Sequence, residues 1–206
     1  MSHYTLYGRQ GSGSLAVEVA LEEIGVSYQR IWISKDAAEV ARFRKINPTG
    51  KVPALALPDG TVMFESAAIL IHLSLAHPKA GLAPEPGSGA HALFLQWMTF
   101  LSANVYEAVL RMYYSSRYTT DEADAEPIRE QGVRDFLRHV ELIGQSLRPY
   151  VLGERYSIAD AYLYMLASWF PTGTGDLHAQ VPSLGLHAQK LALRPVISKV
   201  EADHTV

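Results

Sequence analysis

The segment Asn47–Leu73 constrains the fold of this chain more than any other part of the sequence. It contains two short apolar runs of strand length, Ala54–Leu57 and Thr61–Phe64, separated by Pro58-Asp59-Gly60. Proline presets φ, and Asp and Gly tolerate turn conformations, so this pattern predicts a β-hairpin. Glu65-Ser66 follows at once and opens a run with helical spacing of apolar residues. Those apolar residues are Ile69, Leu70 and Leu73.

Two features of this segment can carry chemistry. A cis bond before Pro53 would turn the N–H and C=O groups of Val52 outward, where a bound peptide can pair with them as a strand does. The N–H groups at a helix start, together with the Ser66 hydroxyl, can hold a carboxylate, while Glu65 can hold an ammonium group. These groups suit a small zwitterionic peptide. The same spacing also fits an ordinary hairpin followed by a capped helix.

The composition excludes several classes of protein. The chain has 206 residues, 48% of them apolar and 19% charged, which is ordinary for a globular protein. Its net charge of -3 and the lack of a basic run argue against nucleic-acid binding. No apolar stretch approaches the roughly 20 residues that span a bilayer, and the N-terminus does not have the pattern of a signal peptide. We therefore expect no membrane partner and a cytoplasmic location.

The absence of cysteine is the most informative negative observation. It excludes disulfides, thiolate metal sites and any mechanism in which the protein supplies its own catalytic thiol. The eight histidines are scattered and do not form an H-E-x-x-H motif or a comparable cluster. We therefore expect no metal site.

The residues before the hairpin predict a small sheet with helices on its faces, an α/β arrangement. The expected elements are strands at 3–7 and 28–33, a helix at 15–24 that Ser14 caps, and a mixed stretch at 35–46. The loop Gly8–Gly13 joins a strand to a helix, where α/β folds place ligands. It matches neither the dinucleotide-binding nor the Walker pattern. Ser12 is the hydroxyl best placed to meet a ligand there; alternatively, it only caps the helix or is solvated.

From His77 to Gly89 the composition shifts to Pro, Gly, Ala and Ser, which indicates a linker. Beyond it the strand signals end and helical patterns continue, so we expect an all-α second half. The predicted domains are residues 1–77, a linker at 78–89 and a helical domain at 90–206. Within the helical domain, Ser157 and Asp160 have capping-box spacing and a structural role.

One predicted helix, from Ala90 to about Tyr114, is rich in aromatic residues. Most of these rings are expected in a helical core. A few can line an apolar pocket at the domain junction, which is a favoured place for small-molecule sites. The candidate pocket residues are Tyr106, Leu110, Tyr113 and Tyr162.

Three motifs in this order resemble those of the cytosolic glutathione transferases: N-P-T-G-K-V-P-A-L, then D-G-x-x-x-x-E-S-A-A-I-L, then S-I-A-D-A. The similarity covers nearly the whole chain and is greatest to bacterial enzymes of the beta, theta and zeta types. It implies a thioredoxin-like first domain, a helical second domain, a two-fold homodimer and a role in detoxification. Glutathione would be the co-substrate, and the domain junction would take a small hydrophobic electrophile.

The resemblance also implies roles for single residues. The main chain of Val52 would pair with the cysteinyl unit of glutathione, and Glu65 would hold its γ-glutamyl end. The implied glutathione-binding residues are Lys35, Lys51, Val52, Pro53, Glu65 and Ser66. Of these, Lys51 and Lys35 would lie near the glycyl carboxylate or along the peptide.

Several groups remain candidates for activating the glutathione thiol. Gly13 occupies the position of the cysteine of the beta-type enzymes, so the loop is closer to the serine-using pattern. Ser12 is the first candidate. Tyr106, at the position of the beta-type histidine, is the second, and Ser14, Tyr7 or a loop N–H are the others.

Three functions remain in competition. The leading one is a glutathione transferase that activates the thiol for attack on a hydrophobic electrophile. The second is a glutathione-dependent isomerase, dehalogenase or ether-cleaving enzyme. The third is a non-catalytic protein that binds glutathione or another ligand.

Overall fold

The computed structural model describes residues 3–204, apart from the side chain of Thr172. The chain forms two compact units: Met1–Pro86 with Ala192–Val206, which we call the sheet unit, and Gly87–Leu191, which we call the helical unit. The predicted division into an α/β first part and a helical remainder is confirmed. The last residues differ from the prediction, because Ala192–Val206 groups with the sheet unit and not with the helices that precede it.

The sheet unit contains one mixed sheet of four strands in the order β2-β1-β3-β4. Strands β1 and β2 are parallel, and β3 pairs antiparallel with both β1 and β4. The elements of this unit are β1 (Tyr4–Gly8), α1 (Ser14–Ile24), β2 (Tyr28–Trp32), α2 (Ala37–Phe43), β3 (Ala54–Ala56), β4 (Val62–Phe64), α3 (Ser66–Ala76), the 3₁₀ turn η1 (Pro78–Ala80) and α10 (Pro195–His204).

Both faces of this sheet are covered. Helices α1 and α3 pack against each other, and the residues of β1 that alternate toward them are buried, Leu6 completely. On the opposite face Phe43 of α2 packs with Ile33 and Ala54, and Tyr7 lies against this cluster. Because successive side chains of a strand point to opposite faces, Leu6 of β1 faces α1 and α3, whereas Tyr7 faces α2.

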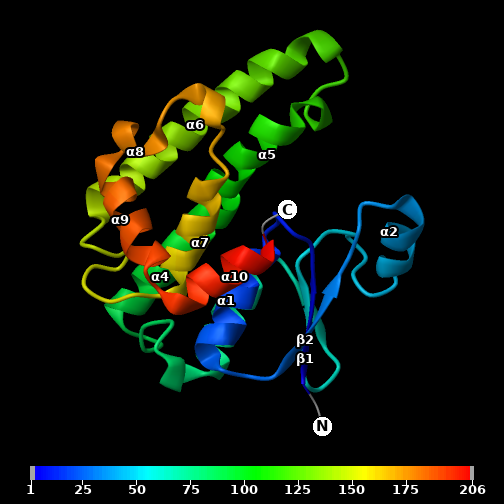
Figure 1. Ribbon diagram of the computed structural model, residues 1–206, viewed down its shortest axis with the longest axis vertical. Coiled ribbons are helices and arrows are strands. Elements are labelled where there is room, and N and C mark those ends of the chain that lie inside the picture. Colours follow the sequence, from blue (N-terminus) through cyan, green and yellow to red (C-terminus); the bar gives the residue numbers. More distant parts are fainter. Residues whose placement is uncertain (1–2, 205–206) are drawn as a thin grey trace. The chain divides into compact units, whose positions relative to one another are not determined.

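Helix α10 lies along α1, as Figure 1 shows. His204 contacts Glu18, and Lys199 forms an ion pair with Glu22 at 2.7 Å. Arg194, just before α10, forms an ion pair with Glu23, also at 2.7 Å. These acidic residues of α1 attract the end of the chain, which explains why it joins the sheet unit.

The helical unit is built from α4 to α9. Its elements are α4 (Gly89–Phe100), the π-helix η2 (Leu101–Val105), α5 (Tyr106–Tyr114), η3 (Ser115–Arg117), η4 (Glu122–Asp124), α6 (Ala125–Ser146), α7 (Ile158–Ser168), η5 (Thr172–Thr174), α8 (Leu177–Gln180) and α9 (Pro182–Ala192). The predicted long helix at 90–114 is thus interrupted by a π-helix that ends directly before Tyr106. Such interruptions are frequent at functional sites.

Helices α5 and α6 run side by side (Figure 1). Gly132 of α6 permits this, since a Cβ there would lie 3.0 Å from the carbonyl oxygen of Ala108. The predicted capping box is confirmed: Asp160 accepts hydrogen bonds from the backbone N–H and the hydroxyl of Ser157 at 2.8 and 3.1 Å. It sets the start of α7 at Ile158.

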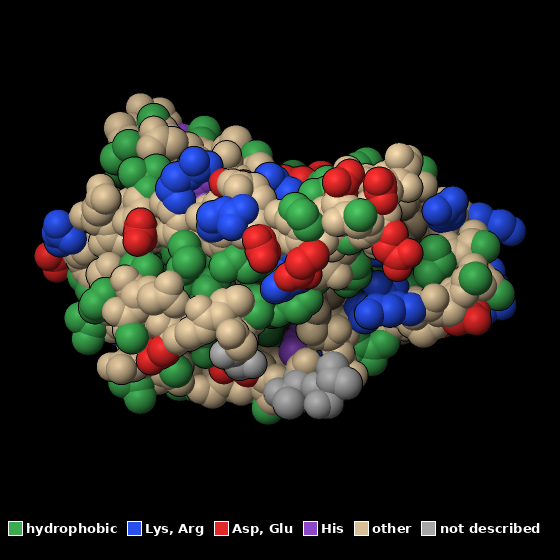
Figure 2. All heavy atoms as spheres, turned by 90° about the horizontal axis from the view of Figure 1, so that it is seen from above, with side chains coloured by type: hydrophobic (Ala, Val, Ile, Leu, Met, Phe, Trp, Pro, Cys, Tyr) green, Lys and Arg blue, Asp and Glu red, His purple; other side chains and the backbone are tan. Residues whose placement is uncertain are grey.

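Basic and acidic side chains are interspersed on the face that Figure 2 shows, where no single-sign patch dominates. Within residues 3–204, no helix is long and apolar enough to cross a membrane.

Candidate functional site

The strand register brings four chain segments to one edge of the sheet. Ala54 lies opposite both Tyr7 and Phe64, and Gly8 lies beside Trp32. The chain leaves the strands here at residues 9–13, 33–35, 52–53 and 65–66, which we call the strand-end site. Five of the residues predicted to bind glutathione therefore lie at one edge, together with Ser12: Lys35, Val52, Pro53, Glu65 and Ser66. Lys51 directly precedes Val52.

Val52 and Pro53 lie directly before β3. Their peptide bond is cis, which is the conformation considered for Pro53 from the sequence. Val52 packs against the cluster of Ile33, Phe43 and Ala54.

The loop that leads to Val52 is held by Asn47, whose side chain is buried. The Asn47 amide donates to the carbonyl oxygen of Lys51 at 2.7 Å and accepts from the N–H of Thr49 at 3.1 Å. Asn47 thereby orders the approach to the cis bond while the Lys51 side chain stays exposed.

Glu65 and Ser66 follow directly after β4, the strand that pairs with β3. Glu65 has φ +71°, and among residues 3–204 it is the only non-glycine residue with a positive φ. Such a backbone costs about 1–3 kcal/mol and is typical of functional sites. The Glu65 side chain is exposed, while Ser66 is buried as the first residue of α3. The first N–H groups of a helix have no intrahelical acceptor, so a carboxylate and a helix N-terminus lie side by side here.

The hydroxyls of the glycine loop are turned toward the loop itself. The Ser12 and Ser14 hydroxyls donate to the carbonyl oxygen of Arg9 at 2.7 and 3.0 Å, and their oxygens lie 2.9 Å apart. Ser14 is completely buried and is the first residue of α1, so it is not the N-cap that the sequence predicted. Gly8 leaves room for it, because a Cβ there would lie 2.8 Å from the Ser14 side chain. Ser12 is half-buried and can donate to a ligand only if its hydroxyl turns away from Arg9.

Sequence reasoning missed the role of Arg9. Its guanidinium donates to the carbonyl oxygens of Ile33 and Ser34, both at 2.8 Å. This ties the end of β1 to the segment that carries Lys35. Lys35 and Lys51 are exposed, and no described carboxylate lies within ion-pair distance of either. For Arg9, the only signal in the sequence was the position of a cation directly after the strand that ends at Gly8.

The loop is also connected to the end of the chain. Gln10 donates to the carbonyl oxygen of Asp203 at 3.1 Å. Beneath this contact, Glu18 accepts from Tyr28 at 2.8 Å and Arg30 at 2.6 Å and contacts the His204 ring at 2.9 Å. Burial alone would raise the pKa of the Glu18 carboxyl, but hydrogen bonds from His204 and Tyr28 and the charge of Arg30 bring it below its usual value.

The remaining predicted residues belong to the helical unit. Tyr106, Leu110 and Tyr113 recur at helical spacing on α5, and Tyr113 is 52% exposed. Tyr162 is wholly buried, with its ring centroid 6.5 Å from that of Tyr106, and its place in a pocket stays a prediction. Trp169 was missed: its ring lies edge-on to Tyr106 at 5.6 Å, and its carbonyl oxygen accepts from Tyr113 at 2.7 Å.

No group of three or more His, Asp or Glu side chains within the described part of the chain could hold a metal ion. The strand-end site offers hydrogen-bond donors, helix N-termini and single charges.

Comparisons with known proteins agree with this geometry. A family model described as glutathione S-transferase, N-terminal domain, matches residues 14–75. The chain is 30% identical over 170 residues to the GST-like protein YncG of Escherichia coli strain K12, covering 81% of this chain and 82% of that protein. It is 24% identical over 197 residues to the glutathione S-transferase GstA of E. coli O157:H7, covering 93% and 94%.

A solved structure is equally similar. The glutathione transferase homologue from Sulfitobacter, crystallised with bound glutathione, aligns with a TM-score of 0.89 and 30% identity over 100% of both chains. The predicted thioredoxin-like fold of the first part is thereby confirmed.

Proposed function

The chain belongs to the cytosolic glutathione transferase family, and we propose that it activates the thiol of glutathione for attack on a small hydrophobic electrophile. The observation that carries the proposal is the strand-end site. It combines the main chain of Val52 next to β3, a carboxylate at Glu65 and two helix N-termini at one sheet edge.

Each part of this site suits one part of the tripeptide. The Glu65 carboxylate would hold the γ-glutamyl ammonium, while Ser66 and the first N–H groups of α3 would hold the neighbouring carboxylate. The main chain of Val52, before Pro53, would pair with the cysteinyl unit as a neighbouring strand does. Lys51 and Lys35, which lack a described carboxylate partner, would neutralise the glycyl carboxylate.

The thiol would then point to the glycine loop at the start of α1. The thiolate is the nucleophile, and a hydrogen bond to sulfur together with the positive end of a helix favours it over the thiol. Each unit by which the thiol pKa falls corresponds to about 1.4 kcal/mol. The sulfur forms a bond to the electrophilic carbon, the leaving group departs with its electron pair, and the thiol proton passes to solvent.

Ser12 is the first candidate for the donor to sulfur. Its hydroxyl points at the Arg9 carbonyl, so a bound thiolate must draw it away from a 2.7 Å hydrogen bond. Tyr106, Tyr7 and the loop N–H groups are the other candidates, whereas the complete burial of Ser14 counts against it.

Calorimetry with glutathione tests the binding part of the proposal. We expect saturable binding, and we expect Glu65→Gln and Ser66→Ala each to weaken it about tenfold, because each removes a charge-assisted hydrogen bond. Glu141→Gln, an exposed change on α6, serves as the matched control and is expected to bind like the wild type. Equal affinity in all four proteins would contradict the assigned site.

A second function is favoured by one observation. Because the Ser12 hydroxyl already donates to Arg9, a protein that binds glutathione without activating it also fits this loop. Glutathione binding without turnover across a panel of haloaromatic, epoxide and ether electrophiles would support this second function. The same panel separates a transferase from a glutathione-dependent isomerase, dehalogenase or ether-cleaving enzyme. We also expect a homodimer, which sedimentation equilibrium tests.

A further inference from the structure

The end of α5 presents an unusual group of side chains. Tyr113, Tyr114 and Tyr118 are exposed by 52%, 37% and 40%, respectively, although large aromatic rings are commonly buried. Arg117 lies among them, with its guanidinium carbon 3.9 Å from the centroid of the Tyr114 ring. We call these four residues the Tyr-Arg cluster.

Local structure holds this cluster in place. The 3₁₀ turn at Ser115–Arg117 brings residues three apart into line, and Arg117 accordingly stacks on Tyr114. Tyr113 donates its hydroxyl to the Trp169 carbonyl at 2.7 Å, which fixes its ring while leaving half of the side chain exposed. The exposed rings are therefore ordered before any ligand arrives, which lowers the entropy lost on binding.

The charge of Arg117 is not compensated. Arg111, six residues earlier, contacts Asp135 at 3.2 Å and Glu107 at 3.8 Å. Among residues 3–204, no carboxylate lies within ion-pair distance of Arg117. Burial raises the pKa of Tyr113, and burial together with a hydrogen bond to Glu107 raises that of Tyr118, so both hydroxyls are neutral near pH 7.

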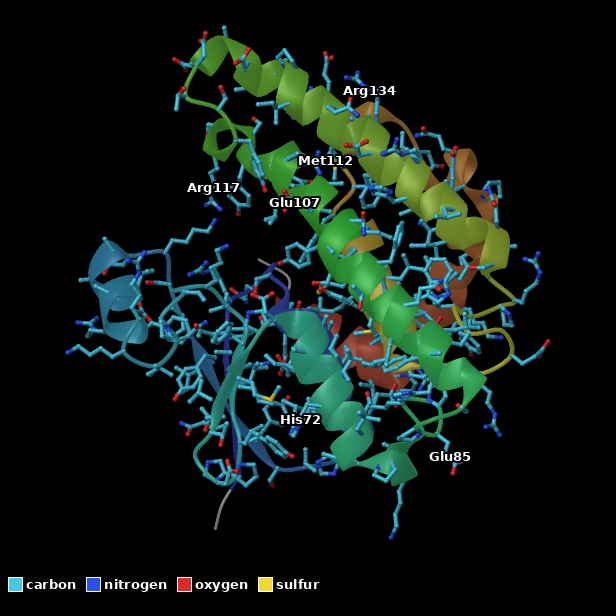
Figure 3. The ribbon with its side chains drawn as sticks, turned by 180° about the vertical axis from the view of Figure 1, so that it is seen from behind. His72, Glu85, Glu107, Met112, Arg117 and Arg134 are labelled. Carbon is cyan, nitrogen blue, oxygen red and sulfur yellow. The ribbon has the colours of Figure 1, made fainter. Side chains whose placement is uncertain are left out.

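The direction of the side chains supports a ligand site. In Figure 3 Met112 lies on the side of α5 that faces α6, while Arg117 extends from beyond the end of α5 away from α6. Tyr106, Leu110 and Tyr113 recur at helical spacing on α5, and Arg117 is the last residue of the 3₁₀ turn that follows this helix. The aromatic side chains at the end of α5 are therefore followed by the guanidinium of Arg117, which has no carboxylate partner among residues 3–204.

We propose that the Tyr-Arg cluster selects aromatic electrophiles that carry an anionic group, with the ring against Tyr113 and the anion on Arg117. A guanidinium stacked on a ring keeps its edge donors free for a carboxylate or sulfonate, which it binds with two parallel hydrogen bonds. The neutral tyrosines supply the apolar contact. This inference rests on the proposed function for its reaction, and it narrows the electrophile from hydrophobic to aromatic and anionic.

A pair of matched substrates tests the inference. Chloronitrobenzoate and its neutral amide, chloronitrobenzamide, differ in charge but not in ring or leaving group. With glutathione, a carbon–sulfur bond forms, the carbon–chlorine bond breaks, chloride leaves with the bonding electrons and the thiol proton passes to solvent. We expect the wild type to show a kcat/KM about tenfold higher for the anion, mostly through KM.

Substitutions assign the preference to one side chain. Arg117→Gln should lower the ratio of kcat/KM for the anion to kcat/KM for the amide to about one, and Arg117→Lys should restore part of the preference for the anion. Arg134→Gln is the matched control, because Arg134 is also an exposed arginine but lies on α6 (Figure 3). It should leave the ratio as in the wild type. No preference in the wild type, or an unchanged ratio in Arg117→Gln, would overturn the proposal.

Calorimetry with unreactive nitrobenzoate, without glutathione, separates this inference from the proposed function. If neither substrate turns over but nitrobenzoate binds and Arg117→Gln weakens it, the cluster is upheld and the catalytic proposal fails. If neither turnover nor binding of nitrobenzoate occurs, the cluster is overturned as well.

Discussion

Each unit of the chain contains a buried histidine paired with a carboxylate, and the two pairs are built in opposite ways. In the helical unit His187 lies 3.0 Å from Asp160, and in the sheet unit His204 lies 2.9 Å from Glu18. All four side chains are nearly or fully buried, and Nδ1 of each histidine has no hydrogen-bond partner in the described structure. The difference lies in the other partners of the carboxylates.

Asp160 is held by the backbone. It accepts from the N–H of Val151 at 2.7 Å and from the N–H and hydroxyl of Ser157, all within nine residues of itself. Glu18 is held by side chains from other elements, namely Tyr28 and Arg30 of β2. A carboxylate with local backbone donors fixes the start of a helix, whereas one with distant side-chain donors attaches the end of the chain to the fold.

The largest expected effect follows from Asp160→Ala. This change leaves buried N–H groups and His187 without an acceptor, so we expect a loss of roughly 3–5 kcal/mol in the free energy of unfolding. Urea denaturation measures it. Ser157→Ala, which removes only one hydroxyl of the capping box, should cost about 1 kcal/mol. Equal losses in the two variants would show that Asp160 acts only as a cap.

Glu18→Gln should have a smaller and more local effect. Glutamine still accepts from Tyr28 and Arg30 but loses the charge, so we expect a loss of about 1–3 kcal/mol. Hydrogen exchange should show α10 opening more readily, because His204 is then held less tightly. If the amides of α10 exchange as in the wild type, the attachment does not depend on Glu18.

The pH dependence of stability should separate the wild type from this variant. The Glu18 pKa is lower in the folded protein than its ordinary value of 4.5, so folding stability from this group is fully present above that value. This contribution of Glu18 to stability is lost as the pH falls through the pKa that Glu18 has in the folded protein. Denaturation between about pH 5 and pH 3 should therefore show a steeper loss in the wild type than in Glu18→Gln. Parallel curves would contradict the assigned shift.

The smallest effect is expected from Lys199→Ala. This exposed lysine pairs with Glu22 at 2.7 Å on the outside of α10, where solvent screens the charges. We expect no measurable change in the urea midpoint. A shift as large as that of Glu18→Gln would mean that the surface ion pairs, and not the buried network, attach α10.

This contrast also explains what the sequence could and could not predict. The capping box was predictable because Ser157 and Asp160 are three residues apart. The hairpin and the start of α3 were predictable for the same local reason. Contacts between Glu18 and His204 join residues 186 apart, and no periodic pattern marks them. The hydrogen bonds of Arg9 were equally invisible, since their acceptors are carbonyl groups that carry no sequence signal.

Titration of the thiolate absorbance of bound glutathione tests the central claim most directly. Binding at the strand-end site with activation predicts a thiol pKa at least about one unit below that of free glutathione, equivalent to about 1.4 kcal/mol. A bound thiol that titrates at the same pH as free glutathione would contradict the claim that this edge of the sheet activates it.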